Sequence, residues 1–281
     1  MADVDKIVHQ WLKLPHSLYV GSDYSQSNAP DLTIIFIHGL ANSHMMWGSV
    51  LGNLVVPSAR IITVDLLGFG NSPKPQWQVY SAVTQAKALR ATLVRKRVKT
   101  PVLLVGHSLG SLVAVEYASM FPEHIKGLLL CSPPFYKPPK IRQRKLSKPQ
   151  ADDLFRMMYK HTRSRPELYK KIAAAITRAK LINPSFVISD ETLPAIISSL
   201  EMSIENQTAQ ADLLRLSVPT IILYGRVDPF VVKKNIKAID ESAPHVTIKS
   251  VLSGHEVAGS KAYTRVVISS VLSMAANITK K

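Results

Sequence analysis

Six short, largely apolar runs separated by longer helical patterns most constrain how this 281-residue chain folds. The runs are rich in β-branched residues and span residues 32–37, 61–64, 102–105, 125–131, 220–224 and 246–251. This pattern is typical of parallel strands that helices cover on both faces. Helical patterns near 43–56, 79–97, 109–121, 231–241 and 261–277 alternate with the runs. The chain is therefore predicted to form an α/β fold with a mostly parallel central sheet flanked by helices. A short helix near 4–12 and an edge strand near 17–21 are also expected.

The alternation stops between Pro133 and Ser217. This interval opens with several prolines, which cannot continue a strand or a helix. It contains no strand pattern, and helices are expected near 151–163, 166–181 and 190–207. We therefore predict one core made of residues 1–132 and 218–281. A helical cap, residues 133–217, is inserted after the strand that ends near Cys131.

The positive charge of the chain is unevenly distributed. Of a formal net charge of +16, most comes from residues 137–180, where fourteen Lys or Arg accompany three acidic residues. A solvated basic helical face is the expected explanation, and weak contact with an anionic surface is the alternative. The segment shows no nucleic-acid-binding motif, so no nucleic acid partner is expected. The oligomeric state is left open.

Three features of the sequence bear on its compartment. No run of eighteen or more apolar residues predicts a membrane-spanning helix. The first residues lack the pattern of a secretory signal. The single cysteine, Cys131, cannot form an internal disulfide and is expected to be a buried, inert thiol. These features predict a cytoplasmic location.

The motif Gly106-His107-Ser108-Leu109-Gly110 carries the chemistry that the sequence predicts. It follows the run 102–105 directly and precedes a helical run, which is the strand–turn–helix setting of a nucleophile elbow. The flanking glycines let the strand and the helix approach closely at a strained turn. Ser108 is therefore predicted to be a catalytic nucleophile.

A serine needs a base to remove its proton, and nine histidines are candidates. His255 lies just past the last strand, on the carboxyl edge where the sites of parallel sheets form. His107 adjoins the serine but is expected to point elsewhere. The carboxylate that orients the base is predicted to be Asp228, which follows the strand 220–224. The remaining candidates for this role are Asp240, Glu241 and Glu256.

A tetrahedral oxyanion needs two amide donors. The amide of Leu109, the residue after the nucleophile, is predicted to be one. The other is predicted to be the amide of Leu40, because His38-Gly39 turns the chain after the strand 32–37 toward Ser108.

Together these motifs make the chain resemble the α/β-hydrolase superfamily, in its capped branch of serine esterases and carbon–carbon bond hydrolases. His38-Gly39-Leu40-Ala41-Asn42-Ser43 resembles the oxyanion loop of that branch, and residues 65–72 resemble its loop after the next strand, which we interpret as structural. The resemblance covers about residues 32–132 and 218–275, and it implies the triad Ser108, Asp228 and His255. Ser111 departs from the pattern, since many relatives have a second glycine there.

We predict that the protein hydrolyses a carboxylic ester with a small to medium apolar acyl group through an acyl-enzyme. A carbon–carbon bond hydrolase of vinylogous keto-acids and a slow-turnover ligand receptor with the same triad are the alternatives. Activity is expected to fall as pH drops through about 6.5, where an imidazole ordinarily takes up a proton. No metal and no organic cofactor is expected. Apolar residues that could line the acyl pocket, with ordinary packing as the alternative for each, are Met45, Trp47, Phe135, Met157 and Met158.

Overall fold

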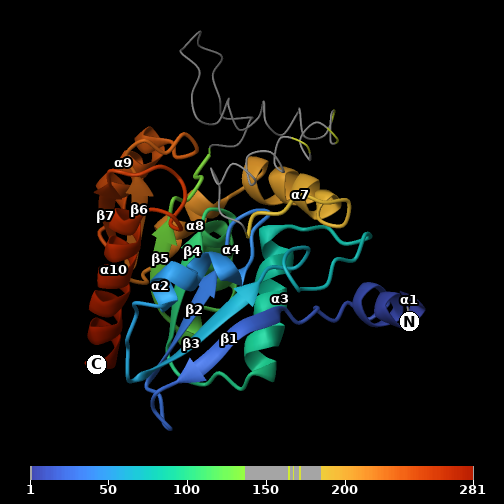
Figure 1. Ribbon diagram of the computed structural model, residues 1–281, viewed down its shortest axis with the longest axis horizontal. Helices are drawn as coiled ribbons and strands as arrows, with labels where there is room; N and C mark the ends of the chain where they lie inside the picture. Colours follow the sequence, from blue (N-terminus) through green and yellow to red (C-terminus); the bar gives the residue numbers. More distant parts are fainter. Residues whose placement is uncertain (1, 137–163, 165–166, 168–170, 172–184, 281) are drawn as a thin grey trace.

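A seven-stranded sheet forms the centre of the protein, in a computed structural model that describes residues 2–136, 164, 167, 171 and 185–280 (Figure 1). The strands are β1 (Tyr19–Ser25), β2 (Leu32–Ile37), β3 (Ala59–Asp65), β4 (Val102–His107), β5 (Ile125–Cys131), β6 (Thr220–Gly225) and β7 (Val246–Val251). Their order across the sheet is β1-β3-β2-β4-β5-β6-β7. Only β1 runs antiparallel to its neighbour, and β2 to β7 pair in parallel. The predicted α/β fold is confirmed.

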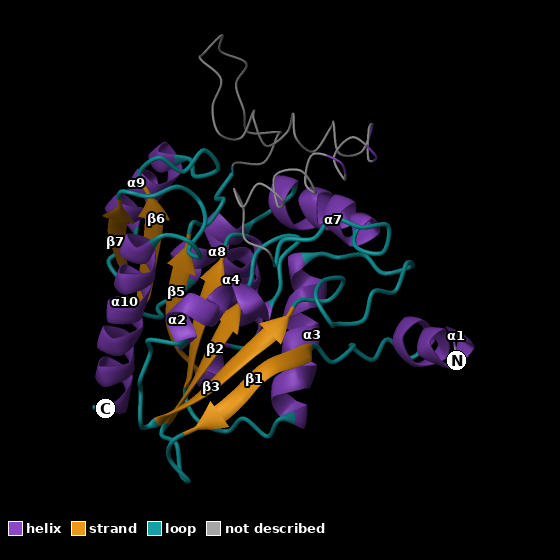
Figure 2. Ribbon diagram, in the orientation of Figure 1, coloured by secondary structure: helices purple, strands orange, loops and turns teal. Residues whose placement is uncertain are grey.

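Helices cover both faces of the sheet, as Figure 2 shows. Alternate residues of β2 enter opposite cores: Ile35 and Ile37 pack with one cluster, and Ile34 and Phe36 with the other. The first cluster includes residues of α3 (Ala82–Arg95), α4 (Leu109–Met120), α8 (Ala209–Arg215) and α9 (Lys233–Ser242). The second includes residues of α2 (Gly48–Leu51) and α10 (Lys261–Thr279). Burial on both faces explains why these strands are apolar without alternation.

Some elements differ from the sequence prediction in length. The helix expected over 43–56 is a 3₁₀ turn, η2 (His44–Trp47), followed by α2, which ends just before Gly52 and Asn53. Both of these residues have low helix preference, which explains the early end. The expected edge strand near 17–21 is the longer β1, and the expected helix near 4–12 is α1 (Ala2–Asp5) followed by the π-helix η1 (Lys6–Trp11). A further short 3₁₀ helix is η3 (Pro122–His124).

The described part of the interval between β5 and β6 is helical and contacts the core. It contains α7 (Leu193–Ser199), η5 (Leu200–Glu205) and α8, so the helix expected over 190–207 is present as two elements. The amide of Tyr80 donates to the Ser198 hydroxyl at 3.0 Å, and the Ser203 hydroxyl donates to the Tyr80 carbonyl at 3.0 Å. The helices expected at 151–163 and 166–181, and the basic segment 137–180, lie outside the described residues apart from three single positions. The division into core and cap stays a prediction.

Two further features of the chain concern its longest helix and its cysteine. The described helices, including the 19-residue α10, include none that combines the length and apolar character needed to cross a bilayer. Cys131 ends β5 and is completely buried, and this burial raises the pKa of its thiol far above the ordinary value. The expectation of a buried thiol is confirmed.

Candidate active site

Ser108 lies at a strained turn between β4 and α4. Its backbone has φ 51° and ψ −117°, a conformation that residues with a side chain rarely adopt. The turn brings three backbone segments together: a Cβ on Gly106 would lie 2.4 Å from the Gly110 carbonyl oxygen, and one on Gly110 would lie 2.4 Å from that of Ile37. Glycine at both positions is therefore required for this geometry.

Hydrogen bonds from the neighbouring strand fix the turn. The Ser108 amide donates to the carbonyl of Cys131 at 2.9 Å. The hydroxyl of Ser111 donates to the carbonyl of Gly106 at 2.9 Å. Ser111 therefore uses the position where relatives of the predicted family often have glycine to add a hydrogen bond across the turn.

Asp228 and His255 lie on the loops after β6 and β7, and their side chains meet. The Nδ1 of His255 donates to the Oδ2 of Asp228 at 2.8 Å, and the amide of Phe230 donates to the Oδ1 at 2.8 Å. The two loops can approach because Gly225 has no side chain: a Cβ there would lie 2.1 Å from the Gly254 carbonyl oxygen. With Nδ1 engaged as a donor, the Nε2 of His255 remains as the proton acceptor of the ring.

The carboxylate of Asp228 is buried yet stays ionised. Burial raises its pKa, but the hydrogen bond and charge of His255, the Phe230 amide and the Ser132 hydroxyl together hold the pKa below the ordinary value. Ser132 follows β5 with a positive φ of 48°, and its hydroxyl lies 2.9 Å from that of Tyr263, which donates to the Leu223 carbonyl at 3.0 Å. Tyr263 therefore helps to hold Ser132 in place beside the carboxylate.

The imidazole of His255 packs against two rings. The centroid of the Phe230 ring lies 5.0 Å away in an edge-on contact, and that of the His107 ring lies 4.9 Å away. The Nε2 of His107 lies 3.0 Å from the carbonyl oxygen of His255, so this ring nitrogen is directed to the loop after β7 and not to the Ser108 hydroxyl. His107 thus links the turn of Ser108 to the loop of His255. Among the contacts of the described residues, none is a hydrogen bond between the Ser108 hydroxyl and His255.

The backbone of residues 39–40 lies against Ser108. A Cβ on Gly39 would lie 3.1 Å from the Cβ of Ser108, so only glycine allows this approach without a shift. In the described part of the chain, no hydrogen bond uses the amides of Leu40 or Leu109. Both amides are therefore available to a ligand at this end of the sheet.

The imidazole of His38 holds the predicted oxyanion loop. Its Nδ1 donates to the Gly39 carbonyl at 2.7 Å, and its Nε2 accepts from the Leu66 amide at 2.8 Å. Complete burial lowers its pKa to about 4, so the ring is neutral and this tautomer is fixed. The sequence predicts that His38-Gly39 turns the chain but predicts no role for the His38 ring, whose only signal is its place immediately after a buried strand.

The loop of residues 65–72 is held by Asp65. Its buried carboxylate accepts from the His44 amide at 2.6 Å, from His44 Nδ1 at 2.8 Å and from the Asn71 amide at 2.8 Å. Gly70 has a positive φ of 50°, and a Cβ there would lie 2.2 Å from the carboxylate. These contacts support the interpretation of the loop as structural.

The predicted pocket residues occupy different environments. Trp47 is completely buried in the core and packs against Phe36 at 5.1 Å between ring centroids. Phe135 is also completely buried in a core cluster, whereas Met45 is largely exposed. Met157 and Met158 lie outside the described residues. For Trp47 and Phe135 the surroundings favour the alternative of ordinary packing.

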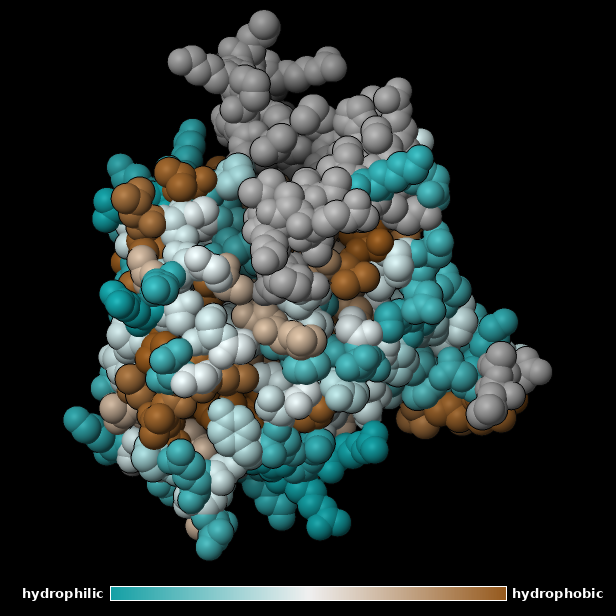
Figure 3. Space-filling view, viewed as in Figure 1, coloured by the Kyte–Doolittle hydropathy of each residue, from teal (hydrophilic) through white to brown (hydrophobic). Residues whose placement is uncertain are grey.

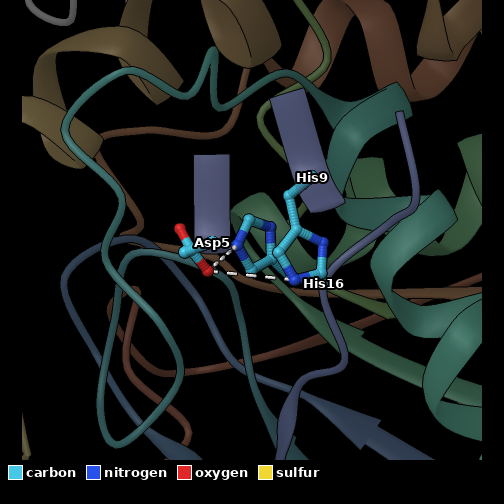
Figure 4. A group of neighbouring side chains, drawn as sticks. All are labelled: Asp5, His9 and His16. Atoms are coloured by element: carbon cyan, nitrogen blue, oxygen red, sulfur yellow. Dashed lines mark hydrogen bonds and ion pairs between the residues drawn. The ribbon is translucent and has the colours of Figure 1, made fainter. Parts of the chain in front are cut away.

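Two groups of side chains in the described residues have donor atoms close enough to hold a metal ion. One group contains His107, His255 and Glu256. The imidazole of His255 in this group also donates a hydrogen bond to Asp228. The other contains Asp5, His9 and His16. The carboxylate of Asp5 lies 3.8 Å from the Nε2 of His9 and 3.2 Å from the Nε2 of His16 (Figure 4). These three side chains already interact with one another without a further ligand.

Comparison with known families and sequences agrees with this geometry. Residues 33–261 match the model of a family described as alpha/beta hydrolase fold. The chain is 35% identical to "Probable lysophospholipase BODYGUARD 1" of Arabidopsis thaliana, over 46% of this chain and 29% of that protein. It is 24% identical to "Lipase 3" of Moraxella sp. (strain TA144), over 76% of this chain and 68% of that protein. The matched region thus spans less than a third of the length of the Arabidopsis relative.

Solved structures share the fold over almost the whole chain. The esterase EaEST from Exiguobacterium antarcticum superposes with a TM-score of 0.73 and 18% identity, covering 92% of this chain and 95% of that one. The enol-lactonase from Burkholderia xenovorans LB400 has a TM-score of 0.69 and 15% identity, covering 92% and 95%. Because the sequence identities are only 18% and 15%, these two structures show similarity of fold alone.

Proposed function

Because the chain belongs to the α/β-hydrolase family, we propose that it is a serine esterase in which Ser108, His255 and Asp228 act as the catalytic triad. The observation that carries this proposal is the 2.8 Å hydrogen bond between His255 and Asp228, which leaves the second imidazole nitrogen as an acceptor. The imidazole lies 4.9 Å, between ring centroids, from that of His107, the residue before Ser108. The similarity to esterases and a lipase supports an ester as the substrate.

In the first half of the reaction, the hydroxyl oxygen of Ser108 attacks the ester carbonyl carbon while the Nε2 of His255 takes the hydroxyl proton. The imidazolium that forms is stabilised by the ionised carboxylate of Asp228. The amides of Leu40 and Leu109 bind the negative oxygen of the tetrahedral intermediate. The carbon–oxygen bond to the alcohol then breaks, and the alcohol leaves with the proton from His255.

In the second half, the Nε2 of His255 takes a proton from a water molecule, whose oxygen attacks the acyl carbon. The bond to Ser108 breaks, its oxygen takes the proton back from His255, and the carboxylic acid leaves. This scheme needs no group beyond the side chains and amides named above.

We propose that the acyl group of the substrate is apolar and of small to medium size. The Phe230 ring is an apolar neighbour of His255, with 5.0 Å between the ring centroids, and the relatives named above include an esterase and a lipase. The sequence leaves two alternatives open. The substrate could be a vinylogous keto-acid, cleaved at a carbon–carbon bond, or the protein could be a ligand receptor that turns over slowly with the same triad.

A substrate panel with a covalent probe tests the proposal. The wild-type protein is expected to hydrolyse p-nitrophenyl acetate and butyrate with multiple turnovers, and a fluorophosphonate is expected to label Ser108 in intact mass spectra. Ser108→Ala should lose at least about 10⁴-fold in kcat/KM and all labelling, whereas Ser269→Ala, at an exposed position on α10, should match the wild type. Ester turnover by Ser108→Ala equal to that of the wild type would refute the proposal. Turnover confined to a vinylogous keto-acid would favour the carbon–carbon hydrolase.

A further inference from the structure

The N-terminal segment, which is helical up to Trp11, exposes apolar side chains to solvent. Val4, Ile7, Trp11 and Leu12, here called the apolar face, are each between 51% and 81% exposed. Val4, Ile7 and Trp11 recur at the spacing of one helical side. A helix of a globular protein ordinarily buries such a side against the core. Here none of the side chains of η1 is buried.

The polar side of the same segment faces the protein body. The carboxylate of Asp5 lies 3.2 Å from the Nε2 of the buried His16, and His9 stacks on His16 with ring centroids 3.6 Å apart. His9 also contacts the carbonyl of Leu14, at 2.7 Å from Nδ1. The His16 ring packs against Trp77, and a pocket of about 340 Å³ is lined both by the loop of Trp77 and by residues of the segment that include Leu14. Polar contacts therefore hold the segment in an orientation that leaves the apolar face outward.

The pictures agree with this arrangement. The α1 label and the N-terminus stand apart from the sheet and its helices in Figure 1. In Figure 3, apolar side chains gather along the underside of this projection. A projecting, convex apolar strip suits insertion into a soft, broad surface better than it suits a groove on another protein.

We propose that the apolar face inserts into the interfacial layer of an anionic phospholipid bilayer. Trp11 is the type of side chain that settles at the boundary between headgroups and acyl chains. Lys6 and Lys13 are exposed on the same segment, and the chain as a whole carries a net charge of +16, so an anionic surface attracts it. The same charge disfavours a second copy of the chain as the occupant, because two such molecules repel each other.

The vesicle-binding experiment does not depend on the proposed esterase activity. The full chain is sedimented with vesicles of phosphatidylcholine, with and without phosphatidylserine, at low and high salt. The wild type is expected to bind the phosphatidylserine vesicles, with a blue shift of tryptophan emission that Trp11→Phe reduces. Binding should weaken as salt increases.

Paired charge variants separate insertion from simple electrostatic attraction. Ile7→Glu with Trp11→Glu is expected to lower the vesicle partition coefficient at least about tenfold. Val55→Glu with Val94→Glu changes the net charge equally at two other exposed apolar positions and should lower it by less than about threefold. Both variants should keep the melting temperature of the wild type.

Three results would overturn the proposal. One is the absence of wild-type binding to anionic vesicles at low salt. Another is an equal loss of binding in the two charge variants, which would assign the attraction to charge alone. The third is light scattering that shows a dimer, abolished by Ile7→Glu with Trp11→Glu, in a chain that does not bind vesicles.

Discussion

His255 and Asp228, which are 27 residues apart in the chain, share a hydrogen bond of 2.8 Å at the carboxyl edge of the sheet. They meet because β6 and β7 are parallel neighbours, so the loops that follow them leave the sheet side by side. Ser108 follows β4 at the same edge.

Asp228→Asn is expected to lower kcat by about 10³- to 10⁴-fold with little change in KM. An amide presents a donor as well as an acceptor to the imidazole, so it does not hold the proton on Nδ1 and does not stabilise the imidazolium. Steady-state kinetics with p-nitrophenyl butyrate measures the effect. A loss of less than tenfold would point to another carboxylate, of which Glu256 is adjacent to His255 in the chain.

Ser132→Ala is expected to reduce kcat by about 3- to 10-fold, because a hydrogen bond to a charged carboxylate is lost. The Ser132 hydroxyl helps to lower the pKa of Asp228, so its removal raises that pKa. Because Asp228 acts through the imidazole of His255 and not on the substrate itself, the loss should fall on kcat and leave KM almost unchanged. Ser250→Ala, at an exposed position on β7, is the control. An unchanged kcat, or a loss that appears mainly as a higher KM, would contradict this role for Ser132.

Gly110→Ala is expected to destabilise the protein by more than about 2 kcal/mol. The new Cβ would lie 2.4 Å from the Ile37 carbonyl oxygen, and backbone atoms cannot move aside without separating α4 from β2. Urea unfolding measures the change. Gly48→Ala adds the same methyl group where nothing lies within 4 Å, and it should leave stability unchanged or slightly higher. Equal effects of the two substitutions would show that close packing at the elbow is not required.

The free energy of unfolding is expected to fall as the pH drops from about 6.5 toward about 4. His38 keeps a pKa of about 4 in the folded protein because it is buried, whereas an unfolded chain protonates a histidine at about 6.5. Between these values the unfolded state binds more protons, so acidification favours unfolding, by about 2 kcal/mol between pH 7 and pH 5.

Urea denaturation of His38→Gln and of the control His124→Gln, a substitution at an exposed position, tests this dependence. The first variant should show a shallower decline of stability with falling pH, and the second should follow the wild type. The slope is the relevant readout, since His38→Gln also changes hydrogen bonds. An unchanged slope would remove His38 as a cause of acid sensitivity.

The strands and the three candidate catalytic residues could be predicted because their signals are local. Strands such as β2, buried on both faces, are continuous apolar runs, and loops after parallel strands lie on one edge whatever the intervening chain does. Ser108, Asp228 and His255 were predicted from their places after such strands.

The supporting contacts could not be predicted, because they depend on residues that are distant in the chain. Ser132, which follows β5, is not an acidic residue, so the sequence predicted no catalytic role for it. Its contact with Asp228 depends on the neighbouring loop and on Tyr263 from α10. The partner of His107 could not be predicted for the same reason, since it is a carbonyl 148 residues away. Trp47 is an apolar residue whose pattern suits a pocket and a core equally well, and its packing against Phe36 is a tertiary feature.

The burial of Cys131 makes the protein convenient for site-specific chemistry. It is the only cysteine of the chain, and a thiol enclosed at the end of β5 does not react with maleimides or disulfide reagents while the sheet is intact. A cysteine introduced on the surface, for example at Trp11, would therefore accept a fluorophore or spin label selectively without removal of the native residue. In unlabelled protein, the rate at which the native thiol becomes modified would instead report how often the central sheet opens.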